Sequence, residues 1–207
     1  MTSERRRTGS TIDAIGAELI AMAEEDQRVR AELLADGTLF HGYNPRMAEV
    51  HHRNAMRLAE IMDAIGWPGR SAVSMEAADA AWLVLQHSIG DPPVMRRGLE
   101  LIRAAPPGDV DPIQVAMLED RVRTYSGLPQ RYGTQFDWDE HGEMQPRPIE
   151  DPGQVDERRR SVGLGPLSEK LREIREGTVR AGELSPAEAA SRRREIDEWE
   201  RSVGWHD

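Results

Sequence analysis

The chain contains no cysteine, and this absence excludes several kinds of chemistry at once. Disulfide bonds, thiolate nucleophiles and cysteine-based zinc or iron–sulfur sites cannot form. Long hydrophobic runs are also missing, since no stretch approaches the roughly 18 apolar residues of a membrane-spanning helix. The three arginines at residues 5–7 are not followed by an apolar segment of secretory length. We therefore expect a cytoplasmic protein that has no membrane partner.

The chain has fewer basic than acidic residues. The chain has 27 lysines and arginines against 37 aspartates and glutamates, which gives a net charge of -10. Nucleic-acid binding depends on a basic surface that displaces counterions from the phosphates. The acidic balance therefore predicts that nucleic acid is not a partner.

The common phosphate-binding and nucleophile motifs are absent as well. Gly-x-x-x-x-Gly-Lys, Gly-x-Gly-x-x-Gly and Gly-x-Ser-x-Gly do not occur. Their absence disfavours the usual nucleotide-dependent and serine-hydrolase mechanisms. The sequence indicates no particular cofactor.

Helical spacing of apolar residues dominates what is present. Together with capping residues and Gly/Pro stops, it predicts helices over about 11–35, 45–65, 75–88, 94–104, 112–125, 155–162, 166–176 and 186–202. Aromatic residues and threonine around a Gly-containing turn at 131–149 predict a β-hairpin. The expected fold is mainly α, a compact multi-helix domain with one small β-hairpin. The apolar helix that contains Trp82 should lie at its centre.

The predicted domain organisation has three parts. Residues 1–10 form a disordered N-terminus, residues 11–176 form a single helical domain, and residues 177–207 form a C-terminal helical extension. The extension has only a thin apolar seam, so its sequence leaves open whether it docks on the core.

Two polar residues interrupt the apolar stripe of the second predicted helix. His51 and Asn54 fall on the same face as Met47, Val50 and Leu58. An unsatisfied buried polar group costs roughly 1–3 kcal/mol, so both side chains need partners. Either His51 is an acid–base group beside an orienting amide, or the pair bonds to backbone carbonyls at a helix crossing.

Further polar residues occur in other apolar helices. Gln86 could bridge helices or face a ligand, and His87 follows it directly. Arg121 keeps its charge, so if buried it requires a carboxylate or an anionic ligand; a structural ion pair is the alternative. We predict His51, His87 and Arg121 as catalytic residues, with Arg121 anchoring an anion.

The strand-like stretch offers a second group of ligand-binding candidates. A lone glycine in a strand, Gly133, indicates close approach by another backbone or a ligand. The neighbouring side chains could present hydroxyl and amide groups to a pocket. The predicted ligand-binding residues are Asn54, Gln86, Asp120, Tyr132, Thr134 and Gln135.

A metal site is not predicted. His41, His51, His52 and His87 suggest one, but helical zinc ligands are typically spaced i, i+4 on one face. Adjacent histidines on a helix point about 100° apart. Without cysteine, a metal would also need carboxylates from elsewhere in the chain.

Several short blocks stand in an order that resembles an uncharacterised bacterial domain family of unknown function. These blocks are Gly66-Trp67-Pro68, Ala81-Trp82-Leu83-Val84-Leu85-Gln86-His87, Leu118-Glu119-Asp120-Arg121, Tyr132-Gly133-Thr134-Gln135 and Pro148-Ile149-Glu150-Asp151-Pro152. The similarity covers about residues 43–171 and leaves the last predicted helix outside. It implies a domain boundary and no chemistry.

The polar residues on core faces predict an internal polar pocket. We expect an enzyme, a hydrolase or a transferase, that acts on a small polar molecule, anionic or amide-bearing, by histidine-assisted acid–base chemistry. The alternative is a non-catalytic protein-interaction module, in which the acidic surface and the C-terminal helix bind a protein partner. An effector that acts on a cellular metabolite is compatible but has no specific residue in its support.

Overall fold

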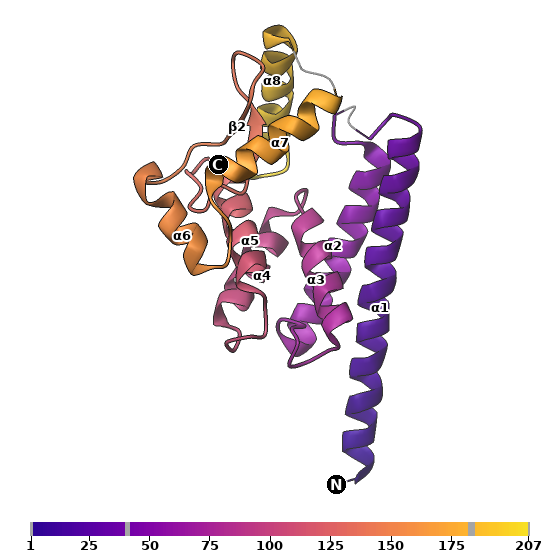
Figure 1. Cartoon of the computed structure of the whole chain (residues 1–207). Helices are drawn as coiled ribbons and strands as arrows, with labels where there is room; N and C mark the ends of the chain where they lie inside the picture. The colour runs from indigo at the N-terminus through magenta and orange to yellow at the C-terminus, as the bar shows by residue number, and fades with distance from the viewer. Residues whose placement is uncertain (1, 40–41, 182–184, 207) are drawn as a thin grey trace. The chain divides into compact units, whose positions relative to one another are not determined.

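The computed structural model describes residues 2–39, 42–181 and 185–206. Its helices (Figure 1) are α1 (Thr2–Ala35), α2 (Pro45–Ile65), α3 (Met75–His87), α4 (Pro92–Ala104), α5 (Pro112–Tyr125), α6 (Val155–Ser161), α7 (Leu167–Ala181) and α8 (Pro186–Ser202), with a 3-10 turn at Pro152–Gln154. Strands β1 (Phe136–Trp138) and β2 (Met144–Pro146) form an antiparallel hairpin in which Phe136 pairs with Pro146. This confirms the predicted fold class.

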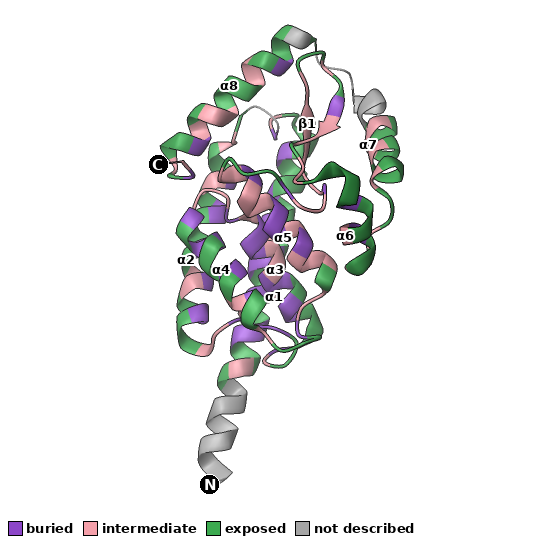
Figure 2. Cartoon of the chain, turned by 90° about the vertical axis from the view of Figure 1, so that its left-hand side faces the viewer, coloured by how far each residue is buried: buried purple, intermediate pink, exposed green. Residues whose placement is uncertain are grey.

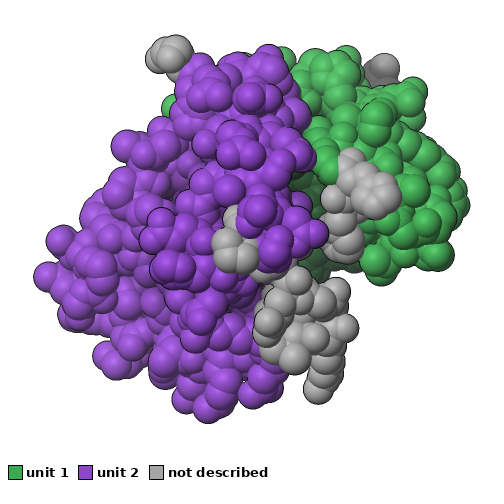
Figure 3. Space-filling view, turned by 90° about the horizontal axis from the view of Figure 1, so that it is seen from above, with its two compact units in different colours: residues 1–111 green, residues 112–207 purple. Residues whose placement is uncertain are grey.

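The chain divides into two compact units, Met1–Asp111 and Pro112–Asp207 (Figure 3). Unit 1 contains α1 to α4, and unit 2 contains the remaining elements. The predicted single domain, residues 11–176, spans the boundary between these units. The predicted C-terminal extension belongs to unit 2.

Helix α3 lies at the centre of unit 1, as predicted, because it packs against α1, α2 and α4. Figure 2 shows buried residues on the inward sides of these helices and exposed residues on their outward sides. The crossing of α3 and α4 is close at Gly98, where an added Cβ would lie 2.5 Å from Leu85 Cδ2. A side chain larger than glycine's would therefore force these helices apart.

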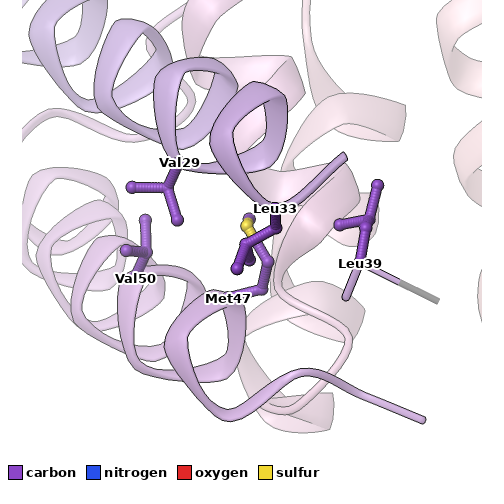
Figure 4. Close-up of a cluster of buried hydrophobic side chains, with 5 residues drawn as sticks. All are labelled: Val29, Leu33, Leu39, Met47 and Val50. Atoms are coloured by element: carbon purple, nitrogen blue, oxygen red, sulfur yellow. The ribbon is translucent and has the colours of Figure 1, made fainter. Parts of the chain in front are cut away.

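A small apolar cluster closes the end of unit 1 where α1 turns back into α2 (Figure 4). Val29 and Leu33 of α1 point toward Met47 and Val50 of α2, with Leu39 beside them. The cluster fixes the pairing of α1 and α2 by burying apolar area on both helices.

Local sequence signals set the starts of three helices. The Asn44 side chain accepts a hydrogen bond from the Arg46 N–H, with Pro45 at the first helical position. Ser74 accepts from the Ala77 N–H, and Ser185 forms a capping box with Glu188. These caps confirm the predicted starts of α2, α3 and α8.

Helix α1 differs from the expectation, since it begins at Thr2 and so includes residues 2–10. The sequence analysis assigned these residues to a disordered N-terminus. They contain no proline, and a helix propagates easily once it is nucleated.

In unit 2 the predicted first strand is shorter than expected, because it starts at Phe136 rather than near Arg131. Side chains of Asp120 and Gln130 bind the backbone N–H groups of residues 131, 132, 134 and 135. These N–H groups are therefore not available to a neighbouring strand, and the segment forms a loop.

Helix α8 and the residues after it pack within unit 2. The Trp205 ring stacks on Tyr125 with 5.1 Å between ring centroids, and Trp199 meets the same ring edge-on at 6.1 Å. The buried Glu200 carboxylate lies 3.4 Å from Arg147 Nη1 and 2.9 Å from His206 Nε2. The aromatic residues of the C-terminal segment thus contact the unit to which it belongs.

Among the described residues, none of the helices combines the length and the hydrophobicity that a membrane crossing requires.

Candidate functional site: an aspartate between two histidines

Helix α1 supplies a buried carboxylate to the interior of unit 1. Leu19, Met22, Val29 and Leu33 form a buried stripe, and Asp26 lies on it with a residue exposure of 1%. Three- and four-residue spacing places all five positions on one helix face. Burying an ionised carboxylate is costly without partners, so Asp26 must find them on neighbouring helices.

Two imidazoles from different helices provide those partners. His87 Nδ1, at the end of α3, lies 3.0 Å from Asp26 Oδ1 and 2.8 Å from Oδ2. His51 Nε2, in the middle of α2, lies 3.0 Å from Asp26 Oδ2. The two imidazole rings are 5.0 Å apart. Asp26, His51 and His87 therefore form one cluster across three helices.

The second nitrogen of His51 is also engaged. Tyr43 Oη lies 2.7 Å from His51 Nδ1, and the Tyr43 ring stacks on the imidazole at 5.8 Å. Gly90 packs beside Tyr43, because a Cβ at this position would be 3.8 Å from Tyr43 Cε1. Tyr43 therefore fixes the orientation of the His51 ring.

His87 is the more accessible histidine. Its side chain is 22% exposed, compared with 10% for His51 and 1% for Asp26. Its Nδ1 binds Asp26, and no hydrogen-bond partner of its Nε2 is found among the described residues. His87 is therefore the member of the cluster that can meet a ligand from solvent.

The histidines keep Asp26 ionised. Burial by itself would raise the pKa of Asp26, but the contacts with His51 and His87 outweigh this effect and hold the pKa well below its ordinary value. No arginine or lysine pairs with Asp26 in the part of the chain that the structure describes. The carboxylate is therefore stabilised by its contacts with the two imidazoles.

Asn54 lies nearby but has a structural contact of its own. It is 3% exposed and its Nδ2 donates to the Met22 carbonyl at 3.2 Å. This bond joins α2 to α1, which matches the structural alternative considered for the sequence. Gln86 is buried beside His87 in α3.

The remaining predicted residues lie in unit 2 and form a separate network. The Asp120 carboxylate, which is 0% exposed, accepts hydrogen bonds from the backbone N–H groups of Arg131, Tyr132 and Thr134 and from the Thr134 hydroxyl. Burial raises the pKa of Asp120, and these hydrogen bonds oppose the rise. A carboxylate has about four acceptor positions, so these bonds account for its capacity.

The amides around this loop are used in the same way. Gln130 donates to the carbonyls of Gln135 and Arg147 and accepts from the Gln135 N–H. The Gln135 side chain donates to the Thr134 hydroxyl at 3.1 Å. The contacts of Asp120, Thr134 and Gln135 hold a loop in shape, and their role in ligand binding stays a prediction.

Gly133 and Arg121 also lie in unit 2. Gly133 has φ +64°, and a Cβ there would lie 2.9 Å from Leu167 Cδ1. The close approach predicted at this glycine therefore comes from a side chain of α7. Burial lowers the pKa of Arg121, and the field of Tyr125 opposes that shift.

The predicted residues are thus divided between the two units. His51, Asn54, Gln86 and His87 belong to unit 1, whereas Arg121, Asp120, Tyr132, Thr134 and Gln135 belong to unit 2. His41 lies outside the described residues. The prediction of one pocket shared by both groups stays a prediction.

Sequence reasoning missed Asp26 and the role of Tyr43. A signal for Asp26 was present, since it continues the spacing of Leu19, Met22 and Val29. Glu24 and Glu25 precede it directly, so charge alone does not distinguish Asp26 from its neighbours.

The geometry also changes the case for a metal. The prediction of no metal rested on the lack of i, i+4 histidines and of a nearby carboxylate. The structure supplies the carboxylate from α1, and the ligand atoms of Asp26, His51 and His87 all lie within 4.8 Å of one another. These three residues could hold a metal ion.

Comparison with known proteins identifies a family. The family model described as a family of unknown function (DUF6624) matches residues 13–179. The chain belongs to this family. The match is longer than the resemblance seen in the sequence, because it includes residues 13–35 of α1 and therefore Asp26. It ends before α8, as the resemblance did. No curated protein and no solved structure matches the chain.

Proposed function

We propose that this DUF6624 protein is an enzyme that acts on a small polar molecule, with His87 as the group that transfers a proton. The observation that carries the proposal is the geometry of His87. Its Nδ1 lies 2.8 Å from the Asp26 carboxylate, while its ring is partly exposed. An aspartate that holds one imidazole nitrogen fixes the tautomer and leaves the other nitrogen as a base.

The chemistry follows from that tautomer. With a proton on Nδ1, His87 presents the lone pair of Nε2 and can take a proton from a hydroxyl, amine or water of the bound molecule. The imidazolium that forms is stabilised by the negative charge of Asp26, and it can return the proton to a leaving group. General acid–base groups of this kind typically contribute about 10²–10⁴-fold to a rate. This sequence of events fits a hydrolase or a transferase.

His51 supports the carboxylate in this proposal and does not itself react. Tyr43 occupies its Nδ1, and Nε2 is buried against Asp26. His51 was predicted to transfer the proton, whereas the greater exposure of His87 favours His87 for this role. Arg121 belongs to the other unit and is not part of the proposal.

The alternative, a protein-interaction module that uses the C-terminal helix, receives less support. Trp205 is 2% exposed, and the rings of Trp199 and Trp205 contact Tyr125 within unit 2. The Trp205 side chain is therefore not displayed for a partner.

A ligand screen tests the proposal. Thermal shifts would be measured with nucleotides, phosphates and amino acids, on the wild type, on His87→Gln and on His52→Gln. His52 is a matched control, because it is the neighbour of His51 and its side chain is 64% exposed. A ligand at 100 times its Kd stabilises a protein by about 2.7 kcal/mol. We expect a shift in the wild type and in His52→Gln and its loss in His87→Gln; a shift that His87→Gln retains would contradict the proposal.

A further inference from the structure

We infer that Asp26, His51 and His87 form a binding site for one divalent metal ion of the zinc type. The inference deepens the proposed function, on which it rests, by naming a cofactor for the same cluster. In the loaded site His87 Nδ1 would bind the ion in place of its proton, so the ion would take over from His87 the activation of a water or hydroxyl group. The hydrogen-bonded arrangement described above is then the metal-free form of the site.

The donor set fits such an ion. Zinc binds imidazole nitrogen and carboxylate oxygen at about 2.0–2.2 Å, and catalytic sites use three protein ligands with one position left open. Tetrahedral geometry places neighbouring ligand atoms about 3.4 Å apart. The carboxylate contacts of 2.8 and 3.0 Å are near this value, and all three ligand atoms lie within 4.8 Å. A small movement of the partly exposed His87 ring would complete the geometry.

The second observation is that His51 Nε2 lacks a well-directed hydrogen bond. This nitrogen is buried and lies 3.0 Å from Asp26 Oδ2, yet it has no hydrogen bond of acceptable geometry with any described atom. A buried polar nitrogen without a well-directed bond costs about 1–3 kcal/mol. A cation placed among the three ligand atoms would use the lone pair of this nitrogen and remove that cost.

The surrounding side chains match the outer contacts of known metal sites. A metal-bound histidine usually has a partner at its other ring nitrogen, which fixes the orientation of the ring. Tyr43 Oη takes this position, 2.7 Å from His51 Nδ1. Gln27 Nε2 donates to Asp26 Oδ1 at 3.0 Å, which leaves Oδ2 directed to the histidines. Tyr43 is thus a positioning residue.

Charge also favours a cation. The Asp26 side chain is 1% exposed, and its ion-pair contacts among the described residues are with the two imidazoles. A divalent ion with one carboxylate and two neutral imidazoles leaves a net charge of about +1 at the site. Such a charge would attract an anionic or polar ligand to the open position. Metal binding would require deprotonated ligands and so would strengthen as the pH rises.

Metal titration of the full chain tests the inference. After treatment with a chelator, the protein would be titrated with Zn²⁺ by calorimetry and with Co²⁺ by visible absorption. We expect one ion per chain and the absorption bands of tetrahedral or five-coordinate Co²⁺. Loss of an outer contact alone weakens metal sites by about 10–100-fold. We therefore expect Tyr43→Phe to bind about 10-fold more weakly and His87→Gln more than about 100-fold more weakly.

The control is His52→Gln, which should bind as the wild type does. His52 contacts Asp91 at 2.8 Å on the exposed side of α2 and lies outside the cluster. Circular dichroism and the Tm without metal would show that His87→Gln is folded. A wild type that binds neither ion at a one-to-one ratio, or equal weakening in His52→Gln and His87→Gln, would overturn the inference.

The outcomes also separate this inference from the proposed function. A small-molecule shift that depends on His87 and persists in the chelator, without metal binding, would refute the metal site and leave the proposed function standing. The protein could instead bind metal at a one-to-one ratio and show no His87-dependent small-molecule ligand, with or without metal. That result would refute the proposed function and leave the metal site standing.

Discussion

The bond between Asp26 and His87 should make a measurable contribution to the stability of unit 1. The contact is short on both oxygens, 2.8 and 3.0 Å, and the carboxylate side chain is 1% exposed. A hydrogen bond to a charged group typically contributes about 1.5–3 kcal/mol. Asp26→Asn weakens the contacts with both histidines but no longer buries a charge. We expect the free energy of unfolding to fall by about 2–4 kcal/mol.

A double-mutant cycle isolates the pair itself. Asp26→Asn, His87→Gln and the double variant would be unfolded in urea at neutral pH with a chelator present, and followed by circular dichroism. We expect a coupling energy of about 1.5–3 kcal/mol, because directly bonded buried groups are not additive. Hydrogen exchange of α1 and α3 peptides would show that the loss lies in unit 1.

The matched control is the pair of Arg53 and Glu25, which joins the same helices α1 and α2 on the surface. Their side chains are 53% and 40% exposed, and the contact is 2.7 Å. Exposed ion pairs couple by about 0.2–1 kcal/mol. If the Asp26–His87 coupling is no larger than that of this control, the carboxylate does not hold His87 as described.

Three further predictions concern packing, the unit 2 loop and pH. Gly98→Ala should lower the free energy of unfolding by about 1–3 kcal/mol, because its Cβ would meet Leu85 at 2.5 Å. Gly16→Ala is the control: its Cβ would lie 3.5 Å from the nearest atom, so it should be neutral or stabilising in the same urea titration. Equal destabilisation by the two substitutions would contradict this prediction. Asp120→Asn should lower the free energy of unfolding by about 1–3 kcal/mol, because an amide cannot accept all the hydrogen bonds from the loop. Proteolysis near residue 133 should also become faster. An unchanged rate of proteolysis would show that the loop does not depend on this carboxylate. Because the pKa of Asp26 is lowered in the native state, its contribution to stability is present above its ordinary pKa, about 3.9, and is lost as the pH falls through the native value. The difference in free energy of unfolding between the wild type and Asp26→Asn should therefore shrink on acidification below about pH 4. A difference that grows would refute the assignment.

Local features of the fold could be predicted from the sequence because their causes are local. Asn44, Ser74 and Ser185 each bind a backbone N–H within three residues along the chain, so a short window contains the whole interaction. The polar interruption of α2 at His51 was also visible, since spacing alone shows which face a residue occupies. Neither signal depends on which helix lies opposite.

The partners of these polar residues could not be predicted in this way. Glu24, Glu25 and Asp26 are consecutive acids, and steps of about 100° turn only one of them fully inward; Asp26 is buried, whereas Glu24 is exposed. Which residue is buried depends on the packing of α1 against α3. Likewise, the Asp120 side chain binds a loop more than ten residues away, and this breaks the strand that the aromatic residues and threonine had predicted.

The cluster can form only when the three helices that carry it are correctly aligned. Asp26 comes from the long helix α1, whereas His51 and His87 come from α2 and α3. Sliding α1 by one residue along its axis would shift the carboxylate by about 1.5 Å and turn it by about 100°, which would bring Glu25 or Gln27 toward the interior. Any such slippage would separate the three groups at once, so a loss of the correct helix alignment would also remove the site.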